Sequence, residues 1–134
     1  MSRISNLIFG SAIFLPFLFS CSRKTLPAGA STILPVDPYA QAIQSDPTAC
    51  LIDVRTPEEY AEGHIDGAKL LNVMDSTAFA VSVDRLSPDS TYYIYCRSGR
   101  RSQKAAALMV KRGLKVVDLK GGFNAWKERR PSEP

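Results

Sequence analysis

The sequence predicts one α/β domain with a mostly parallel sheet and helices on both faces of that sheet. Short apolar runs alternate along the chain with segments whose apolar residues recur at helical spacing, which is typical of strands joined by helical crossovers. The run 49–54 is apolar except for Asp53, as expected for a strand that is covered on both sides. With 134 residues the chain is long enough for one such domain and not comfortably for two.

Five segments have the composition of strands. The clearest is 91–95, where β-branched and aromatic residues follow a turn rich in serine, proline and aspartate. Consecutive parallel strands require right-handed crossover connections, and the segments between the strands are long enough to supply them. The predicted strands cover residues 32–34, 49–54, 68–73, 91–95 and 115–119.

Capping residues set the boundaries of the predicted helices. Thr56 and Glu59 form a capping box with proline at the first helical position, and Gly63 is placed to end that short helix. Asp37, followed by proline, predicts the start of an earlier helix, and Asp75 predicts the start of a later one. The predicted helices cover residues 37–44, 57–62, 76–86, 102–112 and 122–126.

The amino-terminal residues predict a signal that directs the protein to a membrane, rather than a part of the folded domain. Arg3 precedes an apolar run, 7–19, that has the length of a secretory signal and is interrupted by glycine, serine and proline. The run leads to Cys21 in a context that resembles a bacterial lipobox, where a lipid is attached to the cysteine sulfur. We expect a signal peptide over 1–20, a lipidated cysteine and linker over 21–31, a domain over 32–130 and a tail over 131–134.

An uncleaved amino-terminal anchor is the alternative to the lipidated cysteine. In both cases the domain is expected in the cell envelope, attached to a bacterial membrane and facing the periplasm or the exterior. Either attachment keeps the domain near that membrane, because a ten-residue linker reaches at most about 35 Å.

The charges are unevenly distributed and favour a localised anion site. The stretch from Asp37 to Asp89 holds ten acidic and three basic residues, whereas Cys96 to Arg130 holds eleven basic and two acidic ones. The aromatic residues of the basic half do not alternate with its bases, so no nucleic-acid partner is expected. Three cysteines and one histidine give no disulfide framework and no zinc spacing, so we expect no metal and no cofactor.

Cys96 is the candidate nucleophile. It lies between the predicted strand 91–95 and the helix that follows, where helix dipole and free backbone N–H groups favour an anion. Arg97, Arg100 and Arg101 add positive charge, and Gly99 allows the backbone to curl its N–H groups inward. Such surroundings lower the pKa of a thiol and make it reactive. The alternative interpretation is an inert, buried cysteine that only fills space.

Four motifs in this order resemble the rhodanese-like sulfurtransferases: LIDVRTPEEY at 51–60, GHIDGA at 63–68, YCRSGRRS at 95–102 and LKGGFNAW at 119–126. The resemblance covers nearly all of residues 32–127. It implies a small five-stranded α/β domain in which Cys96 is the catalytic residue. It also implies that the rest of the loop binds the substrate, through Arg97, Ser98, Gly99, Arg100 and Arg101.

In this family the thiolate takes a sulfane sulfur from a small anionic donor such as thiosulfate and passes it from a persulfide to a thiol or cyanide-type acceptor, for example a thioredoxin-like protein. Phosphatases with a similar loop need arginine six positions after the cysteine, where this chain has Ser102. The shorter loop suits a sulfur atom rather than a phosphoryl group. Arg97 and Arg101 resemble thiosulfate-using rather than mercaptopyruvate-using members. A non-catalytic persulfide carrier or partner-binding module is the alternative function.

Several other residues are expected to be structural. His64 is interpreted as a turn residue bonded to backbone, with proton shuttling as the alternative. Asp53 and Arg55 are interpreted as a buried ion pair that holds strand ends, with a part in catalysis as the alternative. Trp126 and Cys50 are expected to pack in the core. We also expect Cys50 and Cys96 to lie near opposite ends of parallel strands, too far apart for a disulfide.

Overall fold

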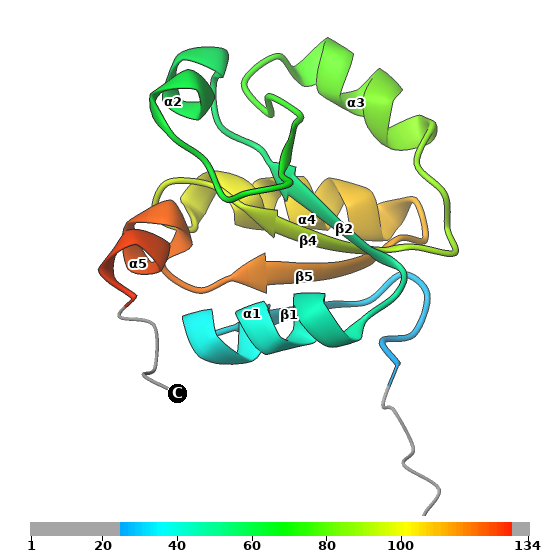
Figure 1. The fold of residues 1–134 in the computed structure, drawn as a ribbon. Helices are drawn as coiled ribbons and strands as arrows, with labels where there is room; N and C mark the ends of the chain where they lie inside the picture. Colours follow the sequence, from blue (N-terminus) through cyan, green and yellow to red (C-terminus); the bar gives the residue numbers. More distant parts are fainter. Residues whose placement is uncertain (1–24, 130–134) are drawn as a thin grey trace, which may run out of the picture.

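A computed structural model describes residues 25–129, which fold around one five-stranded sheet (Figure 1). The strand order is β1-β5-β4-β2-β3, and every pairing in it is parallel. The predicted fold class is therefore confirmed. The strands are β1 (Ser31–Leu34), β2 (Ala49–Asp53), β3 (Lys69–Leu70), β4 (Thr91–Tyr95) and β5 (Lys115–Leu119), and the helices are α1 (Val36–Ser45), α2 (Pro57–Glu62), α3 (Ser76–Asp84), α4 (Arg100–Lys111) and α5 (Gly122–Glu128). The expected signal peptide and Cys21 lie outside the described residues.

Two apolar cores lie on opposite faces of the sheet. Alternate residues of each strand point to opposite faces, so Tyr92 and Ile94 of β4 pack on one side and Tyr93 and Tyr95 on the other. Helices α3 and α4 cover the first face, and α1 and α5 cover the second. All five residues of β4 are buried, which explains why its sequence is apolar and aromatic without alternation.

The capping predictions are confirmed for two helices and wrong for one. The Thr56 side chain accepts the Glu59 N–H and the Glu59 carboxylate accepts the Thr56 N–H, as in a capping box. Asp75 accepts the N–H of Ala78 at the start of α3. By contrast, α1 begins at Val36 and has no side-chain cap, so Asp37 lies within its first turn.

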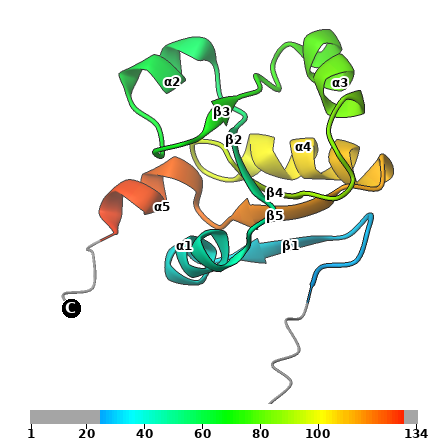
Figure 2. The same cartoon turned by 45° about the vertical axis from the view of Figure 1, so that its right-hand side comes forward.

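Helix α3 ends at Asp84 rather than at residue 86 and α5 at Glu128 rather than at residue 126, and two other boundaries differ for a physical reason. Strand β3 has two residues rather than six, because the chain bends away beyond Leu70 (Figure 2). Two separate bonds follow, from the Leu71 N–H to the Asp53 carbonyl at the end of β2 and from the Val73 N–H to the Val54 carbonyl just after it. Helix α4 begins at Arg100 rather than Ser102, since Gly99 adopts the left-handed conformation that allows the turn into the helix.

The carboxyl edge of the sheet collects the segments that carry the candidate chemistry. The arrowheads of β4 and β5 point toward α5, and the starts of α2 and α4 lie at the same edge (Figure 1). Parallel strands separated by crossovers place their strand-to-helix loops together in this way. No helix within residues 25–129 combines the length and apolar character needed to cross a membrane.

Candidate active site

The loop after β4 closes around the Cys96 sulfur. The Gly99 N–H donates to Sγ at 3.0 Å, and the thiol lies 3.5 Å from the Ser102 hydroxyl oxygen. Ser102 in turn donates to the Gly99 carbonyl at 3.1 Å. Gly99 has a φ of +107°, which L side chains rarely adopt, so only glycine turns its N–H toward the sulfur without strain. The loop therefore forms the predicted cradle of N–H groups around Cys96.

The surroundings of the thiol act on its acidity in opposite directions. Cys96 is 1% exposed, and burial raises the pKa of the thiol because it disfavours the charged form. Hydrogen bonding by the Ser102 side chain and by the backbone N–H groups of Ser102, Gly99 and Ser98 lowers the pKa by more. The pKa of the Cys96 thiol is therefore lower than the usual pKa of a cysteine, as expected for a reactive thiol.

Helix α5 holds this loop from behind. The Phe123 N–H donates to the Cys96 carbonyl at 2.7 Å, and the Asn124 N–H donates to the Arg97 carbonyl at 3.0 Å. The two backbones approach so closely that a Cβ on Gly122 would lie 2.5 Å from the Cys96 carbonyl oxygen. With its carbonyls fixed outward by α5, the loop is left with its N–H groups facing the sulfur.

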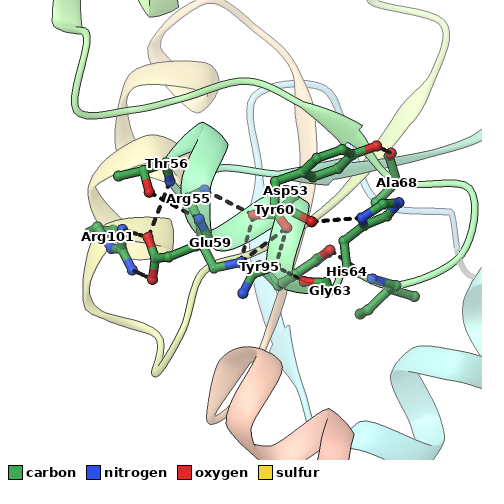
Figure 3. Close-up of polar contacts among 11 residues, drawn as sticks. Asp53, Arg55, Thr56, Glu59, Tyr60, Gly63, His64, Ala68, Tyr95 and Arg101 are labelled. Carbon is green, nitrogen blue, oxygen red and sulfur yellow. Dashed lines mark hydrogen bonds and ion pairs between the residues drawn. The ribbon is translucent and has the colours of Figure 1, made fainter.

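The three loop arginines have different surroundings. Arg97 and Arg100 are exposed beside the cradle, whereas Arg101 is half-buried. The Arg101 guanidinium donates to both carboxylate oxygens of Glu59, at 2.6 and 2.7 Å (Figure 3). Hydrogen bonding to Arg101 lowers the pKa of Glu59 to about 2. Arg101 is therefore tied to α2, while Arg97 and Arg100 have no such ion pair within the described residues.

A buried ion pair supports the loop that leads into α2. Arg55 is 3% exposed and Asp53 is fully buried, and their nearest nitrogen and oxygen are 2.6 Å apart. Arg55 also donates to the Gly63 carbonyl at 2.7 Å (Figure 3). Its guanidinium lies over the Phe123 ring, 4.3 Å from the ring centroid. The pair joins the ends of β2 and α2 to the start of α5, which confirms its structural interpretation.

His64 and Cys50 also take the structural positions expected of them. His64 stacks on Tyr60, and its Nδ1 lies 2.9 Å from the Tyr60 carbonyl oxygen (Figure 3). Cys50 packs against the core under α3 and α4, opposite Tyr92 in the β2–β4 register and thus far from Cys96 along the strands. Trp126 packs against the opposite core. Within residues 25–129 no cluster of histidine, cysteine and carboxylate side chains has a metal-binding arrangement.

Some contributors to the site were not predicted from the sequence. Glu59 was identified only as a helix cap, and the glycine pair at 121–122 only as part of the last of the four motifs. The contact between Ser102 and Cys96 was also missed, because Ser102 lies within the first turn of α4, which begins two residues earlier than expected. A signal was present for Gly122, because two adjacent glycines after a buried strand indicate a close backbone approach.

Comparison with known proteins agrees with this arrangement. The family model of the Rhodanese-like domain matches residues 36–129. A protein named Thiosulfate sulfurtransferase GlpE from Stutzerimonas stutzeri is 35% identical over 86 residues, which cover 63% of this chain and 76% of the relative. A Putative sulfurtransferase YtwF from Bacillus subtilis is 36% identical over 92 residues, covering 68% and 86%.

Solved structures give the same result for the fold. A rhodanese-like domain protein from Staphylococcus aureus superposes with a TM-score of 0.63 at 28% identity, over 71% of this chain and 90% of the other. A rhodanese-related protein from Thermoplasma volcanium gives 0.62 at 25% identity, over 75% and 93%. The chain therefore belongs to the rhodanese-like family.

Proposed function

We propose that this protein is a sulfurtransferase that carries sulfur as a persulfide on Cys96. The thiolate attacks the outer, sulfane sulfur of an anionic donor such as thiosulfate. The sulfur–sulfur bond of the donor breaks, and sulfite leaves with the bonding electron pair. A thiol or cyanide-type acceptor then attacks the outer sulfur of the persulfide and returns Cys96 to the thiolate, so that the two half-reactions follow ping-pong order.

The observation that carries this proposal is a buried thiol of lowered pKa in a cradle of backbone N–H groups. The cradle stabilises negative charge on the thiolate, and the same N–H groups suit the anionic outer sulfur of a persulfide. Arg97 and Arg100 lie exposed at its rim, where they attract a dianionic donor. The names of the relatives point to the same donor class.

A thiosulfate–cyanide assay on the full chain tests the proposal. We expect Cys96→Ser to abolish thiocyanate formation, whereas the matched variant Cys50→Ser keeps it. Mass spectrometry after thiosulfate treatment should show one additional sulfur on the peptide that contains Cys96. Full activity of Cys96→Ser would refute the proposal. A persulfide that forms but is not transferred to any of the acceptors would instead favour the carrier module.

The arginines are expected to differ in their effect on the donor. Removing Arg97 or Arg100 should raise KM for thiosulfate more than removing Lys104, an exposed lysine further along α4 that serves as the charge control. The effect should shrink at high ionic strength, because exposed charges are screened beyond about 10 Å at 0.1 M salt. For Arg101, which already contacts Glu59, we expect a smaller change in KM. Equal KM values in all four variants would contradict this role.

We also propose that Cys21 is lipidated after removal of residues 1–20, so that the domain is anchored to a bacterial membrane and faces the periplasm or the exterior. The apolar run and the lipobox-like context of Cys21 support this. Replacing Cys21 with serine should release the protein from the membrane fraction and remove the mass of the lipid. If the variant stays in the membrane at the same mass as the parent, the uncleaved anchor is correct instead.

A further inference from the structure

Two ion pairs lie at the carboxyl edge of the sheet, where the Cys96 loop is. Asp53 at the end of β2 pairs with Arg55, and Glu59 on α2 pairs with Arg101 on α4 (Figure 3). The side chains of the first pair are at most 4% exposed, whereas both side chains of the second are 24% exposed. Solvent and small anions therefore reach the Glu59–Arg101 pair but not the Asp53–Arg55 pair.

Arg101 lies directly beside the groups that hold the Cys96 sulfur. In the first turn of α4 it precedes Ser102, whose hydroxyl oxygen is 3.5 Å from Sγ, and it follows the turn in which the Gly99 N–H donates to Sγ. Hydrogen bonding to Glu59 raises the pKa of Arg101, and negative charge on Cys96 raises it further, as expected for a cation near the sulfur. Yet two nitrogens of the guanidinium already donate to Glu59, at 2.6 and 2.7 Å. Arg101 is thus a cation next to the cradle whose charge is neutralised before any anion arrives.

Glu59 is held in place by α2 and not by Arg101 alone. Its Oε2 accepts the Thr56 N–H at 3.2 Å in addition to the Arg101 bond, and its own N–H donates to the Thr56 hydroxyl at 3.3 Å. Glutamine fills this position of a capping box as glutamate does. The cap therefore does not require a negative charge, and the charge of Glu59 acts on Arg101.

The first half-reaction has an anion on both sides. Thiosulfate enters the site and sulfite leaves it, and both are small and doubly charged. A cation that binds the two equally lowers KM without accelerating the transfer, and it also slows the release of the product. Arg97 and Arg100 are exposed and form no ion pair within residues 25–129, so they remain free to attract the donor. A third available guanidinium would strengthen the binding of every such anion.

We propose that Glu59 is a specificity-determining residue that keeps the Arg101 guanidinium from binding small tetrahedral dianions at the Cys96 cradle. The inference rests on the proposed function of Cys96 in sulfur transfer. While Glu59 is ionised, the donor is bound by the loop N–H groups with Arg97 and Arg100, and the product leaves without breaking a bond to a third guanidinium. Glu59 thereby limits both the affinity for the donor and the competition from sulfite and sulfate.

The first test measures the binding of sulfate, a tetrahedral dianion that transfers no sulfur. Sulfate in the cradle should slow the alkylation of Cys96 by iodoacetamide, and the sulfate concentration that halves this rate is determined in the full chain at constant ionic strength. Glu59→Gln removes the charge and keeps the cap, and it should lower that concentration about fivefold, the factor expected for releasing a well-formed surface ion pair. Glu58→Gln is the matched control, because it removes the same charge from the neighbouring exposed residue of α2 and should behave like the parent protein.

A double variant shows whether the effect passes through Arg101. Glu59→Gln combined with Arg101→Gln should lose the gain in sulfate binding. The proposal is wrong if Glu59→Gln binds sulfate no more tightly than the parent protein, or if the gain persists without Arg101.

A measurement on the parent protein avoids variants altogether. In an NMR titration, sulfate should shift the guanidinium resonances of Arg97 and Arg100 and leave those of Arg101 in place. An Arg101 shift as large as theirs would show that Glu59 does not keep Arg101 from the anion.

Kinetics with thiosulfate and cyanide separate this role from a merely structural one. Glu59→Gln should lower KM for thiosulfate about fivefold, leave kcat no higher than in the parent protein and strengthen inhibition by sulfite, whereas a loosened fold would raise KM or lower kcat alone. Sulfate binding requires no sulfur transfer. Tighter sulfate binding by Glu59→Gln without thiocyanate formation by the parent protein would therefore contradict the proposed function and leave the role of Glu59 standing, and thiocyanate formation with equal sulfate binding in all variants would do the reverse.

Discussion

Replacing Gly122 with alanine tests whether the start of α5 holds the Cys96 loop in place. The new Cβ would lie 2.5 Å from the Cys96 carbonyl oxygen and 2.7 Å from the carbonyl carbon and oxygen of Arg97. All of these contacts are to backbone atoms, so no side-chain rotation relieves them and either the helix or the loop has to move. Gly122 also has a φ of +60°, a conformation that disfavours alanine.

The expected loss of stability has two parts. The left-handed conformation costs an L residue about 1–2 kcal/mol, and overpacking a filled space typically costs about 1–3 kcal/mol. We therefore expect Gly122→Ala to lower the free energy of unfolding by about 2–5 kcal/mol. Gly113→Ala is the matched control: its φ is +78° and a Cβ there meets nothing within 4 Å, so only the conformational cost applies.

Urea denaturation and the pH profile of Cys96 alkylation measure the two consequences. In addition to its lower stability, Gly122→Ala should raise the pKa of the thiol, because displaced carbonyls no longer keep the loop N–H groups on the sulfur. Gly113→Ala should keep the parent alkylation profile. If both variants lose the same stability and alkylate Cys96 alike, α5 does not position the loop and the reasoning from close backbone approach is wrong.

Three further outcomes are expected. Hydrogen bonding to Arg101 holds the pKa of Glu59 at about 2, below its ordinary 4.5, so the ionised carboxylate stabilises the fold above pH 4.5 and this stabilisation is lost as the pH falls from about 4.5 to about 2. Urea titrations across that range should show that the free energy of unfolding depends less on pH in Glu59→Gln than in the parent protein. An unchanged slope would contradict the pairing. Asp53→Asn leaves a buried guanidinium without its anion and should cost about 3–5 kcal/mol of unfolding free energy, so a loss well below that in the same titration would show that the pair is dispensable. In the register of β2 and β4, Cys50 lies opposite Tyr92, four residues before Cys96 and thus about 13 Å from it at about 3.3 Å per residue. A disulfide needs Cα atoms within about 7 Å, so non-reducing peptide mapping after mild oxidation should find no disulfide between Cys50 and Cys96. A dominant Cys50–Cys96 disulfide would overturn the strand register.

The strands and the position of the nucleophile could be predicted because buried parallel strands appear in the sequence as short runs of apolar residues. Residues 115–119 and 91–95 were predicted with the bounds that the structure has, since both are β-branched or aromatic runs ended by turn residues. The loop after 91–95 followed from topology, because active loops of parallel sheets lie at carboxyl ends. The sequence alone therefore predicts that Cys96 lies in a loop at the carboxyl edge of the sheet.

Contacts between distant segments could not be predicted in this way. Glu59 and Arg101 are 42 positions apart, and nothing in either local sequence indicates that α2 and α4 start side by side. Asp118 is 2% exposed although it is charged, and its local sequence does not indicate this burial. The start of α1 was misplaced since Asp37 and the following proline fit the first turn of a helix as well as its cap.

The sheet order has a consequence for how the protein is made. Within residues 25–129, β1 is the first strand and pairs only with β5, the last strand, which begins about 80 residues later. At about 5–20 residues per second of synthesis, the partner of β1 follows it after roughly 4–16 s. During that interval β1 has no partner strand in the growing chain. The pairing of β1 and the hydrogen bonds from α5 to the Cys96 loop both form only after the final fifth of the chain has been added. An incomplete chain thus has an unpaired first strand and a Cys96 loop without the hydrogen bonds that position it.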